Sequence, residues 1–444
     1  HVVDDIVYDM IPLVEPLVTE GIKDADTIKA AVLNLANIPY PQEEITEAVD
    51  EVLELEKAGQ LFAPDIYENY IFDFKKRQTV VKALCLHIAH DCNLACRYCF
   101  AEEGEYHGRR ALMSYETGKQ ALDFLIANSG SRRNLEVDFF GGEPLMNWQV
   151  VKDLVAYGRE QEKIHNKNFR FTLTTNGVLL NDEIMEFANK EMDNVVLSID
   201  GRKEVHDRMR PFRKGAGSYD LIVPKFQKFA ESRHQDKYYV RGTYTHFNTD
   251  FSKDVLHLAD LGFKQISVEP VVAQPTDEYA LKDSDLPVLF DEYDRLAAEM
   301  VKRNKAGNGF NFFHFMIDLE GGPCVYKRLS GCGSGTEYLA VTPWGDLYPC
   351  HQFVGNEDFL MGNVWDGIKA TDIQDEFKCC NVYAKEKCRN CFARFYCSGG
   401  CAANSYKFHG NILDAYDIGC ELQKKRIECA IMLKAAMADE AEEE

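Results

Sequence analysis

The sequence ALCLHIAHDCNLACRYCF, residues 83–100, decides the fold and the chemistry predicted for this chain. Its first half, Ala83–Ala89, is an apolar run typical of a buried strand. Its second half places three cysteines, Cys92, Cys96 and Cys99, in one short loop. Soft thiolates select zinc, copper(I) or iron–sulfur clusters, and three thiolates offered to a four-iron cluster leave one iron free to bind a small molecule. The stretch therefore indicates an iron–sulfur enzyme.

The loop reads Cys-x3-Cys-x-aromatic-Cys, with Tyr98 at the aromatic position, and resembles the signature of the radical S-adenosylmethionine (SAM) enzymes. In that family the free iron binds the amino and carboxylate groups of SAM, and one electron releases a 5′-deoxyadenosyl radical that removes a substrate hydrogen atom. The resemblance implies a [4Fe-4S] cluster on Cys92, Cys96 and Cys99, with Tyr98 in the SAM site. The alternatives are a structural zinc site or buried cysteines without a metal.

Composition limits the function classes that remain. The length of 444 residues suggests about three domains of ~150 residues. Hydrophobic residues make up 45% of the chain, and no apolar run approaches the ~18 residues that span a bilayer, so we predict a soluble protein with no membrane partner. The formal net charge of −22 argues against nucleic acid as a partner, because binding phosphates requires clustered Lys and Arg.

The fifteen cysteines, with no secretion signal in the sequence, indicate the reducing cytoplasm and metal binding rather than disulfides. Only Cys85 and the three loop cysteines precede residue 300. The others are Cys324, Cys332, Cys350, Cys379, Cys380, Cys388, Cys391, Cys397, Cys401, Cys420 and Cys429. This distribution predicts a second metal-binding region in the last third of the chain.

Within residues 76–305, which we assign to one domain, the chain from about Lys82 to Val272 alternates short apolar runs with amphipathic helical stretches such as Tyr115–Ala127 and Asn147–Glu162. This is the pattern of βα units around a parallel sheet. Six strands are expected, at Ala83–Ala89, Leu135–Phe140, Phe169–Thr174, Val195–Ile199, Tyr239–Thr245 and Gln265–Val271. We therefore predict an α/β fold with a partial (β/α)6 barrel.

Polar motifs follow the first four strands. The cysteine loop follows the first, Gly141-Gly142-Glu143-Pro144 the second and Thr175-Asn176-Gly177 the third, while Ser198 and Asp200 close the fourth. Parallel barrels place their active sites at the carboxyl ends of the strands. The sequence therefore predicts the SAM site at this rim.

Each motif has a chemical reason to bind SAM. The adjacent glycines Gly141 and Gly142 let backbone carbonyls approach an ammonium closely, although a tight turn is the alternative. The segment resembles the family's GGE motif, in which Glu143 adds a carboxylate near the SAM amino group. Short polar side chains suit the ribose hydroxyls and the SAM carboxylate. They are Asn176, Ser198 and Asp200.

Charged residues near the rim extend this set. Arg210 offers a cation to the SAM carboxylate, or else forms a surface ion pair. Arg241 is a second candidate for the same carboxylate. Asp200 and Glu269 are candidates for a catalytic base, and the sequence does not choose between them.

Residues 1–75 have a different character. Amphipathic patterns predict helices at residues 24–36 and 42–58, followed by a wing at Leu61–Pro64. An earlier apolar pattern, Ile6, Met10, Leu13, Val14 and Leu17, suggests another helix, whose length Pro12 and Pro16 leave open. We predict a small winged-helix-like unit.

The charge of this unit argues against DNA binding, because residues 1–65 contain three lysines, no arginine and fifteen acidic residues. Many peptide-modifying radical SAM enzymes carry a leader-recognition element of this helical type with a three-stranded sheet, to whose edge an extended leader adds a strand. The resemblance implies that role here, and we expect the first strands of the element to be either missing or out of view. A helical cap on the barrel is the alternative.

The cysteines of the last third are regularly spaced. The spacing reads Cys332-x12-Gly345-x4-Cys350, then Cys388-x2-Cys391-x5-Cys397-x3-Cys401-x18-Cys420. These seven cysteines resemble the SPASM extension of radical SAM enzymes, which carries two auxiliary iron–sulfur clusters. We assign residues 306–430 to this extension and residues 431–444 to an acidic tail. A zinc ribbon is the structural alternative.

The resemblance also implies how the ligands are shared. Cys388, Cys391, Cys397 and Cys420 would hold one auxiliary cluster, and Cys332, Cys350 and Cys401 the other. The second set is one ligand short. Either Cys324 completes it, or an open iron binds a substrate thiolate beside the carbon that carries the radical, which suits carbon–sulfur bond formation. Cys85, Cys379, Cys380 and Cys429 are left as structural.

The whole pattern most resembles the thioether-forming maturases of cysteine-rich SCIFF peptides. That resemblance implies SAM, three [4Fe-4S] clusters, a ribosomal precursor peptide with a leader, and an electron donor such as flavodoxin or ferredoxin. The nearest alternative is another SPASM enzyme, an anaerobic sulfatase maturase or a carbon–carbon crosslinking maturase. The alternative of another class is a non-catalytic zinc-binding regulatory protein.

Overall fold

The computed structural model describes residues 3–35, 38–74, 76, 78–319 and 324–438. The chain divides into two compact units, His1–Tyr70 and Ile71–Glu444. In the part of the chain that the structure describes, no helix combines the length and the apolar character needed to cross a membrane.

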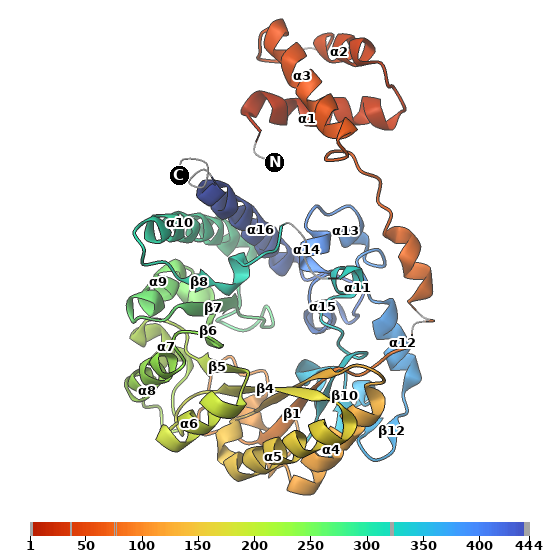
Figure 1. Cartoon of the computed structure of the whole chain (residues 1–444). Helices are drawn as coiled ribbons and strands as arrows, with labels where there is room; N and C mark the ends of the chain where they lie inside the picture. The colour runs from red at the N-terminus through yellow and green to blue at the C-terminus, as the bar shows by residue number, and fades with distance from the viewer. Residues whose placement is uncertain (1–2, 36–37, 75, 77, 320–323, 439–444) are drawn as a thin grey trace. The chain divides into compact units, whose positions relative to one another are not determined.

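The N-terminal unit consists of three helices, α1 (Asp5–Thr19), α2 (Ala25–Leu33) and α3 (Gln42–Lys57) (Figure 1). The side chains of Asp4 and Asp24 cap α1 and α2 by accepting backbone hydrogen bonds. The core of the unit is formed by Val7, Met10, Val14, Ile28, Val32, Ile45, Ala48, Val49 and Val52. All three predicted helices are therefore confirmed, with ends that differ by up to three residues.

Two details of this unit differ from expectation. Helix α1 continues through Pro12 and Pro16, and both prolines are exposed, so that water can reach the carbonyls they leave unbonded. The wing predicted at Leu61–Pro64 is wrong, because these residues form bends and irregular chain. Among the described residues of the unit there is no strand with which a wing could pair.

The second unit is built around one twisted sheet. Six parallel neighbours form its barrel part, β1 (Ala83–His90), β3 (Asn134–Gly141), β4 (Asn168–Thr175), β5 (Asn194–Ser198), β6 (Tyr238–Tyr244) and β7 (Gln265–Pro270). All six predicted strands are confirmed to within one residue at each end. Their parallel order, with each strand beside the next, brings the motifs that follow them to one rim.

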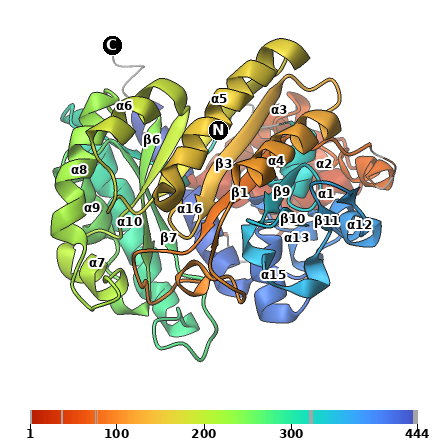
Figure 2. The same cartoon turned by 90° about the horizontal axis from the view of Figure 1, so that it is seen from below.

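Helices cover the outer face of the barrel (Figure 2). They are α4 (Tyr115–Asn128), α5 (Trp148–His165), α6 (Asp182–Glu191), α7 (Lys203–Met209), α8 (Tyr219–Ser232), α9 (Ser252–Asp260) and α10 (Leu286–Lys305). Short 3-10 helices occur at Glu68–Asp73, Glu102–Gly104, Pro144–Asn147, His246–Asn248, Asp283–Asp285, Phe313–Phe315, His351–Phe353 and Glu357–Phe359.

The sheet continues beyond the predicted boundary at residue 305. On one side β8 (Asn311–Phe312) pairs with β7, and on the other β9 (Tyr338–Val341) pairs in parallel with β1. The remaining strands are β2 (Ala111–Leu112), β10 (Asp346–Tyr348), β11 (Gly362–Asn363) and β12 (Gly367–Ile368). The cysteine-rich region therefore shares the sheet of the barrel.

The cysteine-rich region otherwise consists of helices. They are α11 (Val325–Ser330), α12 (Thr371–Cys379), α13 (Glu386–Arg389), α14 (Arg394–Cys397), α15 (Ala402–His409) and α16 (Asp417–Ala438). Helix α16 packs along α10 (Figure 1), where Arg426 Nε donates 2.8 Å to the Tyr293 hydroxyl. The acidic tail predicted from residue 431 is wrong for residues 431–438, which continue α16, and its residues 439–444 lie outside the described part.

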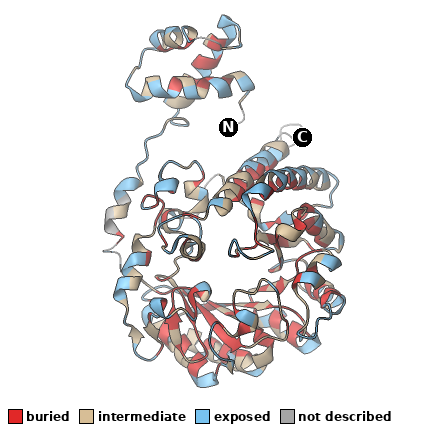
Figure 3. Cartoon of the chain, turned by 180° about the vertical axis from the view of Figure 1, so that it is seen from behind, coloured by how far each residue is buried: buried red, intermediate tan, exposed pale blue. Residues whose placement is uncertain are grey.

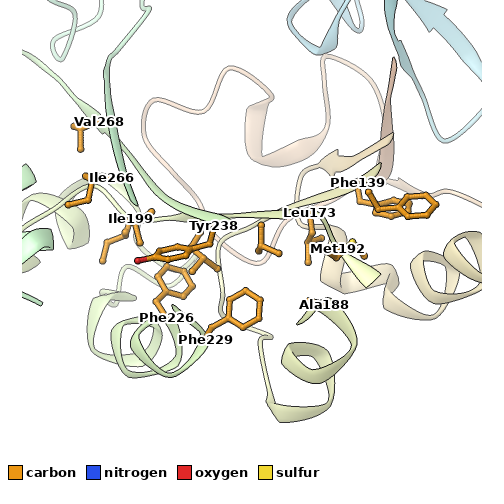
Figure 4. Packing of buried hydrophobic residues seen from close by; sticks show 14 of the residues in the cluster. Phe139, Leu173, Ala188, Met192, Ile199, Phe226, Phe229, Tyr238, Ile266 and Val268 are labelled. Atoms are coloured by element: carbon orange, nitrogen blue, oxygen red, sulfur yellow. The ribbon is translucent and has the colours of Figure 1, made fainter. Parts of the chain in front are cut away.

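The main core lies between the sheet and its helices (Figures 3 and 4). Phe226 and Phe229 of α8 are fully buried against the sheet. Gly177, at the end of β4, has a positive φ of 76°, and a Cβ there would lie 2.1 Å from Cε1 of Phe226. The Phe226 ring thus fixes the turn that follows β4.

Replacing Phe226 by Ala should lower the free energy of unfolding by about 3–5 kcal/mol, because the ring leaves a cavity under this turn. Urea unfolding of the intact chain, followed by circular dichroism, measures the change. Leu221→Ala is the control, because Leu221 is exposed on the same helix and should change stability by less than about 0.5 kcal/mol. Equal losses in the two variants would contradict this account of the core.

Candidate active site

A cavity of about 230 Å³ opens at the carboxyl ends of the barrel strands. It is lined by most of the residues that the sequence singled out: Cys92, Cys96, Tyr98, Cys99, Gly141, Gly142, Asn176, Ser198, Arg210, Arg241 and Glu269. Two expected residues, Glu143 and Asp200, are not in its wall and are fully buried. The rim motifs therefore line one cavity. Glu143 and Asp200 do not line it and are buried next to residues that do.

The segment after α7 holds the cysteine loop. The Ala95 N–H donates 2.9 Å to the Pro211 carbonyl, and the Arg97 N–H donates 2.9 Å to the Met209 carbonyl. Arg213 donates to a carboxylate oxygen of Asp91 at 2.9 Å and to the Cys92 carbonyl at 2.6 Å. These bonds fix the loop backbone, so that its three thiols face the cavity.

The three loop thiols fit a four-iron cluster. Burial raises the pKa of Cys92 and of Cys96 to about 12, so both thiols remain protonated at neutral pH when no metal is bound. Coordination to a cation removes a thiol proton. Three thiols around one cavity, with no fourth supplied by the loop, are the donor set of a cluster with one open iron.

The glycine pair packs directly on this loop. A Cβ on Gly141, whose φ is 118°, would lie 2.4 Å from the Ala89 carbonyl oxygen, and one on Gly142 would lie 2.1 Å from the Asp91 carbonyl oxygen. The Gly142 N–H donates 2.7 Å to Ala89, and the Glu143 N–H donates 2.9 Å to Asp91. The close approach expected of the glycines is therefore made to the chain's own backbone, while both residues also line the cavity.

Glu143 ties the end of β3 to the end of β4. Its carboxylate accepts hydrogen bonds from the Thr175 hydroxyl at 2.7 Å, the Asn176 N–H at 2.8 Å and the Leu145 N–H at 3.0 Å. Burial raises its pKa to about 7, although these bonds oppose the rise. Asn176, held in this way, donates 2.7 Å to the side chain of Asn93 and lies 3.6 Å from the Cys92 sulfur. Glu143 thus positions Asn176.

Asp200 anchors two residues of the cavity wall. The Tyr98 hydroxyl lies 2.8 Å and 2.7 Å from its two carboxylate oxygens. Arg210 Nε donates 2.9 Å to the same carboxylate, and the Thr243 N–H donates 3.1 Å. Burial lowers the pKa of Arg210, but Asp200, Tyr98 and Cys96 together outweigh this effect and raise the pKa well above its usual value. The surface ion pair considered for Arg210 is thus a nearly buried pair with Asp200.

Arg241 and Glu269 form a second ion pair on the cavity wall. Arg241 Nε and Nη2 donate to the two Glu269 oxygens at 3.1 Å and 2.8 Å. Burial alone would raise the pKa of Glu269, but Arg241, with smaller contributions from His314 and Arg426, outweighs it and brings the pKa to about 2. Glu269 is therefore ionised and paired at neutral pH.

Sequence reasoning missed three polar residues of the wall, Thr174, Thr243 and Gln352. Thr243 lies near the end of β6, where the rule that singled out Ser198 on β5 would also have found it. Gln352 comes from the cysteine-rich region, two residues after Cys350, and no local signal connects it with the barrel. Cys350 and Cys99 belong to one apolar cluster, which joins the two regions.

The cysteines of the last third form two groups. Burial raises the pKa of Cys350, Cys380 and Cys401, and the nearby Cys332 raises each of them further. In the other group burial raises the pKa of Cys420, and its neighbours Cys397, Cys388 and Cys391 add to the rise.

Each group contains one of the ligand sets implied by the SPASM resemblance, and their thiols suit iron–sulfur clusters. Cys380, which sequence reasoning left as structural, joins Cys332 in lining a second cavity. Cys324 is exposed at the start of α11 and is not in the wall of that cavity.

Comparisons with known proteins agree with this architecture. The model of the Radical SAM superfamily matches residues 86–268. The radical SAM cyclopropyl synthase TigE of Paramaledivibacter caminithermalis is 23% identical over 373 residues, which are 78% of this chain and 72% of TigE. A serine-type anaerobic sulfatase-maturating enzyme of Bacteroides thetaiotaomicron is 24% identical over 306 residues, which are 62% of this chain and 70% of that enzyme.

Solved structures share the fold. The structure described as native anSMEcpe with bound AdoMet covers 80% of this chain and 99% of its own, with a TM-score of 0.67 and 21% identity. Streptococcus suis SuiB bound to precursor peptide SuiA covers 93% of this chain and 89% of its own, with a TM-score of 0.53 and 18% identity. Residues 86–268 therefore match the Radical SAM superfamily, the chain has the α/β radical SAM fold, and its relatives include a sulfatase-maturating enzyme.

Proposed function

We propose that this protein is a radical SAM/SPASM maturase that forms a thioether crosslink within a cysteine-rich ribosomal precursor peptide of the SCIFF type. The observation that carries the proposal is the junction of the two cysteine regions. Gln352 lines the radical cavity two residues after Cys350, and β9 pairs directly with β1. A substrate sulfur held at Cys332, Cys350 and Cys401 would therefore lie beside the cavity in which the substrate carbon is attacked.

The residues of the barrel have separate tasks in this reaction. Cys92, Cys96 and Cys99 would hold the first cluster, which together with SAM supplies a 5′-deoxyadenosyl radical when bound. The glycine carbonyls, Asn176 and Ser198 would receive the polar groups of SAM, and Arg210 its carboxylate. Their positions are fixed by Glu143 and Asp200, whose oxygens accept hydrogen bonds from Thr175, Asn176, Arg210 and Thr243.

The proposed reaction removes one hydrogen atom, one proton and one electron from the peptide. The substrate carbon loses one hydrogen atom to the radical, and the substrate thiol loses one proton to solvent. The carbon–sulfur bond then forms with release of one electron, which the auxiliary clusters on the two C-terminal cysteine groups would take up. The crosslinked peptide is therefore two hydrogens lighter.

The partners follow from this chemistry. The helical N-terminal unit would receive the leader of the precursor, and SuiB bound to its precursor peptide gives a precedent of the same fold. A flavodoxin or ferredoxin in the reducing cytoplasm would supply electrons. The zinc-binding alternative is less well supported, since a radical SAM domain spans the first cysteine trio.

The direct test is peptide mass. The anaerobically reconstituted, reduced protein, given SAM and a cysteine-rich precursor, should release 5′-deoxyadenosine and yield a peptide two hydrogens lighter. Tandem mass spectrometry should place the link at a cysteine. Cys96→Ala should abolish both products. Cys379→Ala, which removes a cysteine outside both ligand sets, should abolish neither, and SAM cleavage with an unchanged peptide mass would contradict the proposal.

The fourth ligand of the Cys332 group is tested by iron content. If the substrate thiolate takes an open iron, Cys324→Ala and Cys380→Ala should both keep the full iron of the wild type, because neither thiol is a ligand. Iron analysis and electron paramagnetic resonance measure this. Loss of about four irons in either variant would identify a protein ligand at that position and close the site.

Asp200 is tested by removing its charge. Asp200→Asn should lower the free energy of unfolding by about 3–5 kcal/mol, because it leaves the Arg210 cation buried without its partner. It should also weaken SAM binding in equilibrium dialysis, because Tyr98 and Arg210 lose their anchor. Glu204→Gln, on an exposed helix position, is the control and should change neither quantity. Normal SAM binding by Asp200→Asn would remove Asp200 from the site.

A further inference from the structure

Lys385 is a buried cation among the C-terminal cysteines. Its side chain is only 2% exposed, and it lies between α12 and α13, three residues before Cys388. Its ammonium donates 2.9 Å to the Gly399 carbonyl, and no ion pair of the described residues includes it. A buried ammonium is costly unless an opposite charge compensates it. The described chain supplies no such charge at this position.

Lys385 is hydrogen-bonded to the loop that connects the two cysteine groups. Gly399 lies in the loop between Cys397 of one group and Cys401 of the other. Three successive residues of this loop have positive φ values, 59° at Ser398, 84° at Gly399 and 72° at Gly400. This left-handed course turns the loop around the lysine, and a Cβ on Gly399 would lie 3.7 Å from Cδ of Lys385. The loop that links the two groups is therefore packed on the lysine.

Lys385 is placed beside ligands of both groups. It stands three residues before Cys388 of one group, and its hydrogen-bond acceptor Gly399 stands two residues before Cys401 of the other. Lys385 also lines the cavity that Cys332 and Cys380 share. One fixed positive charge thus serves two neighbouring sets of thiolates.

We propose that the Lys385 ammonium is the shared counter-ion of the two auxiliary clusters and makes both easier to reduce. The inference rests on the two auxiliary clusters of the proposed function. A four-iron cluster with thiolate ligands is anionic and gains a further negative charge on reduction. A fixed cation nearby therefore stabilises the reduced form and raises the reduction potential. Lys385 would favour transfer of the electron released by carbon–sulfur bond formation to an oxidised auxiliary cluster.

The test compares three variants of the reconstituted full-length protein. Lys385→Met keeps the length of the side chain and removes its charge, and Lys385→Arg keeps the charge. Lys387→Met removes a charge two residues away from an exposed side chain paired with Asp417. Iron per chain is measured first, and the reduction potentials of the clusters are then titrated by electron paramagnetic resonance, with added SAM to mark the cluster of the Cys92 loop.

In Lys385→Met the auxiliary potentials should move to more negative values, while the potential of the SAM-binding cluster stays unchanged. Lys385→Arg should restore them, and Lys387→Met should leave them in place. Loss of auxiliary iron in Lys385→Met that Lys385→Arg prevents would equally support the counter-ion. Unshifted auxiliary potentials, an equal shift in Lys387→Met, or loss of iron in both Lys385 variants would overturn it. A wild type with iron for one cluster only would overturn the auxiliary clusters of the proposed function as well.

Discussion

The contact on which the site depends is the approach of the β3 end to the backbone of residues 89–91. Gly141 and Gly142 have no room for a Cβ, and their segment is hydrogen-bonded to Ala89 and Asp91. This contact sets the cysteine loop against β3, and Glu143 then ties β3 to β4. The same set of contacts, between the end of β3, residues 89–91 and the end of β4, therefore positions both the cysteine loop and Asn176. Backbone packing requires glycine at positions 141 and 142, and the proposed approach of their carbonyls to SAM requires it as well.

The second constraint is that one sheet serves both cysteine regions. Because β9 lies beside β1, the strand that leads into the radical loop is also the neighbour of the strand that leads toward Cys350. A boundary drawn in the sequence at residue 305 separates segments that are adjacent in the sheet. This shared sheet gives the proposed reaction its geometry, since a radical and a substrate sulfur can meet only where the two regions adjoin.

The sequence predicts the strands well, because apolar runs bounded by turn residues are local signals. It also predicts the rim motifs, since each follows its own strand. It does not predict the roles of Glu143 and Asp200, because their burial and their partners Thr175, Asn176, Tyr98 and Arg210 come from distant segments. The prediction of a wing at Leu61–Pro64 is wrong because a strand needs a pairing partner, and the local sequence pattern does not show whether one is present. Lys385 was missed because only its burial distinguishes it from other lysines.

The charges of the two regions show how differently they are balanced. The chain as a whole carries a net charge of −22. Around the radical cavity it pairs its own cations with carboxylates, Arg210 with Asp200 and Arg241 with Glu269. In the described part of the cysteine-rich region Lys385 is buried without a carboxylate partner, and under our proposal the thiolate-ligated clusters supply the balancing negative charge. If the proposal is correct, the fold around Lys385 should therefore gain stability when the auxiliary clusters are bound.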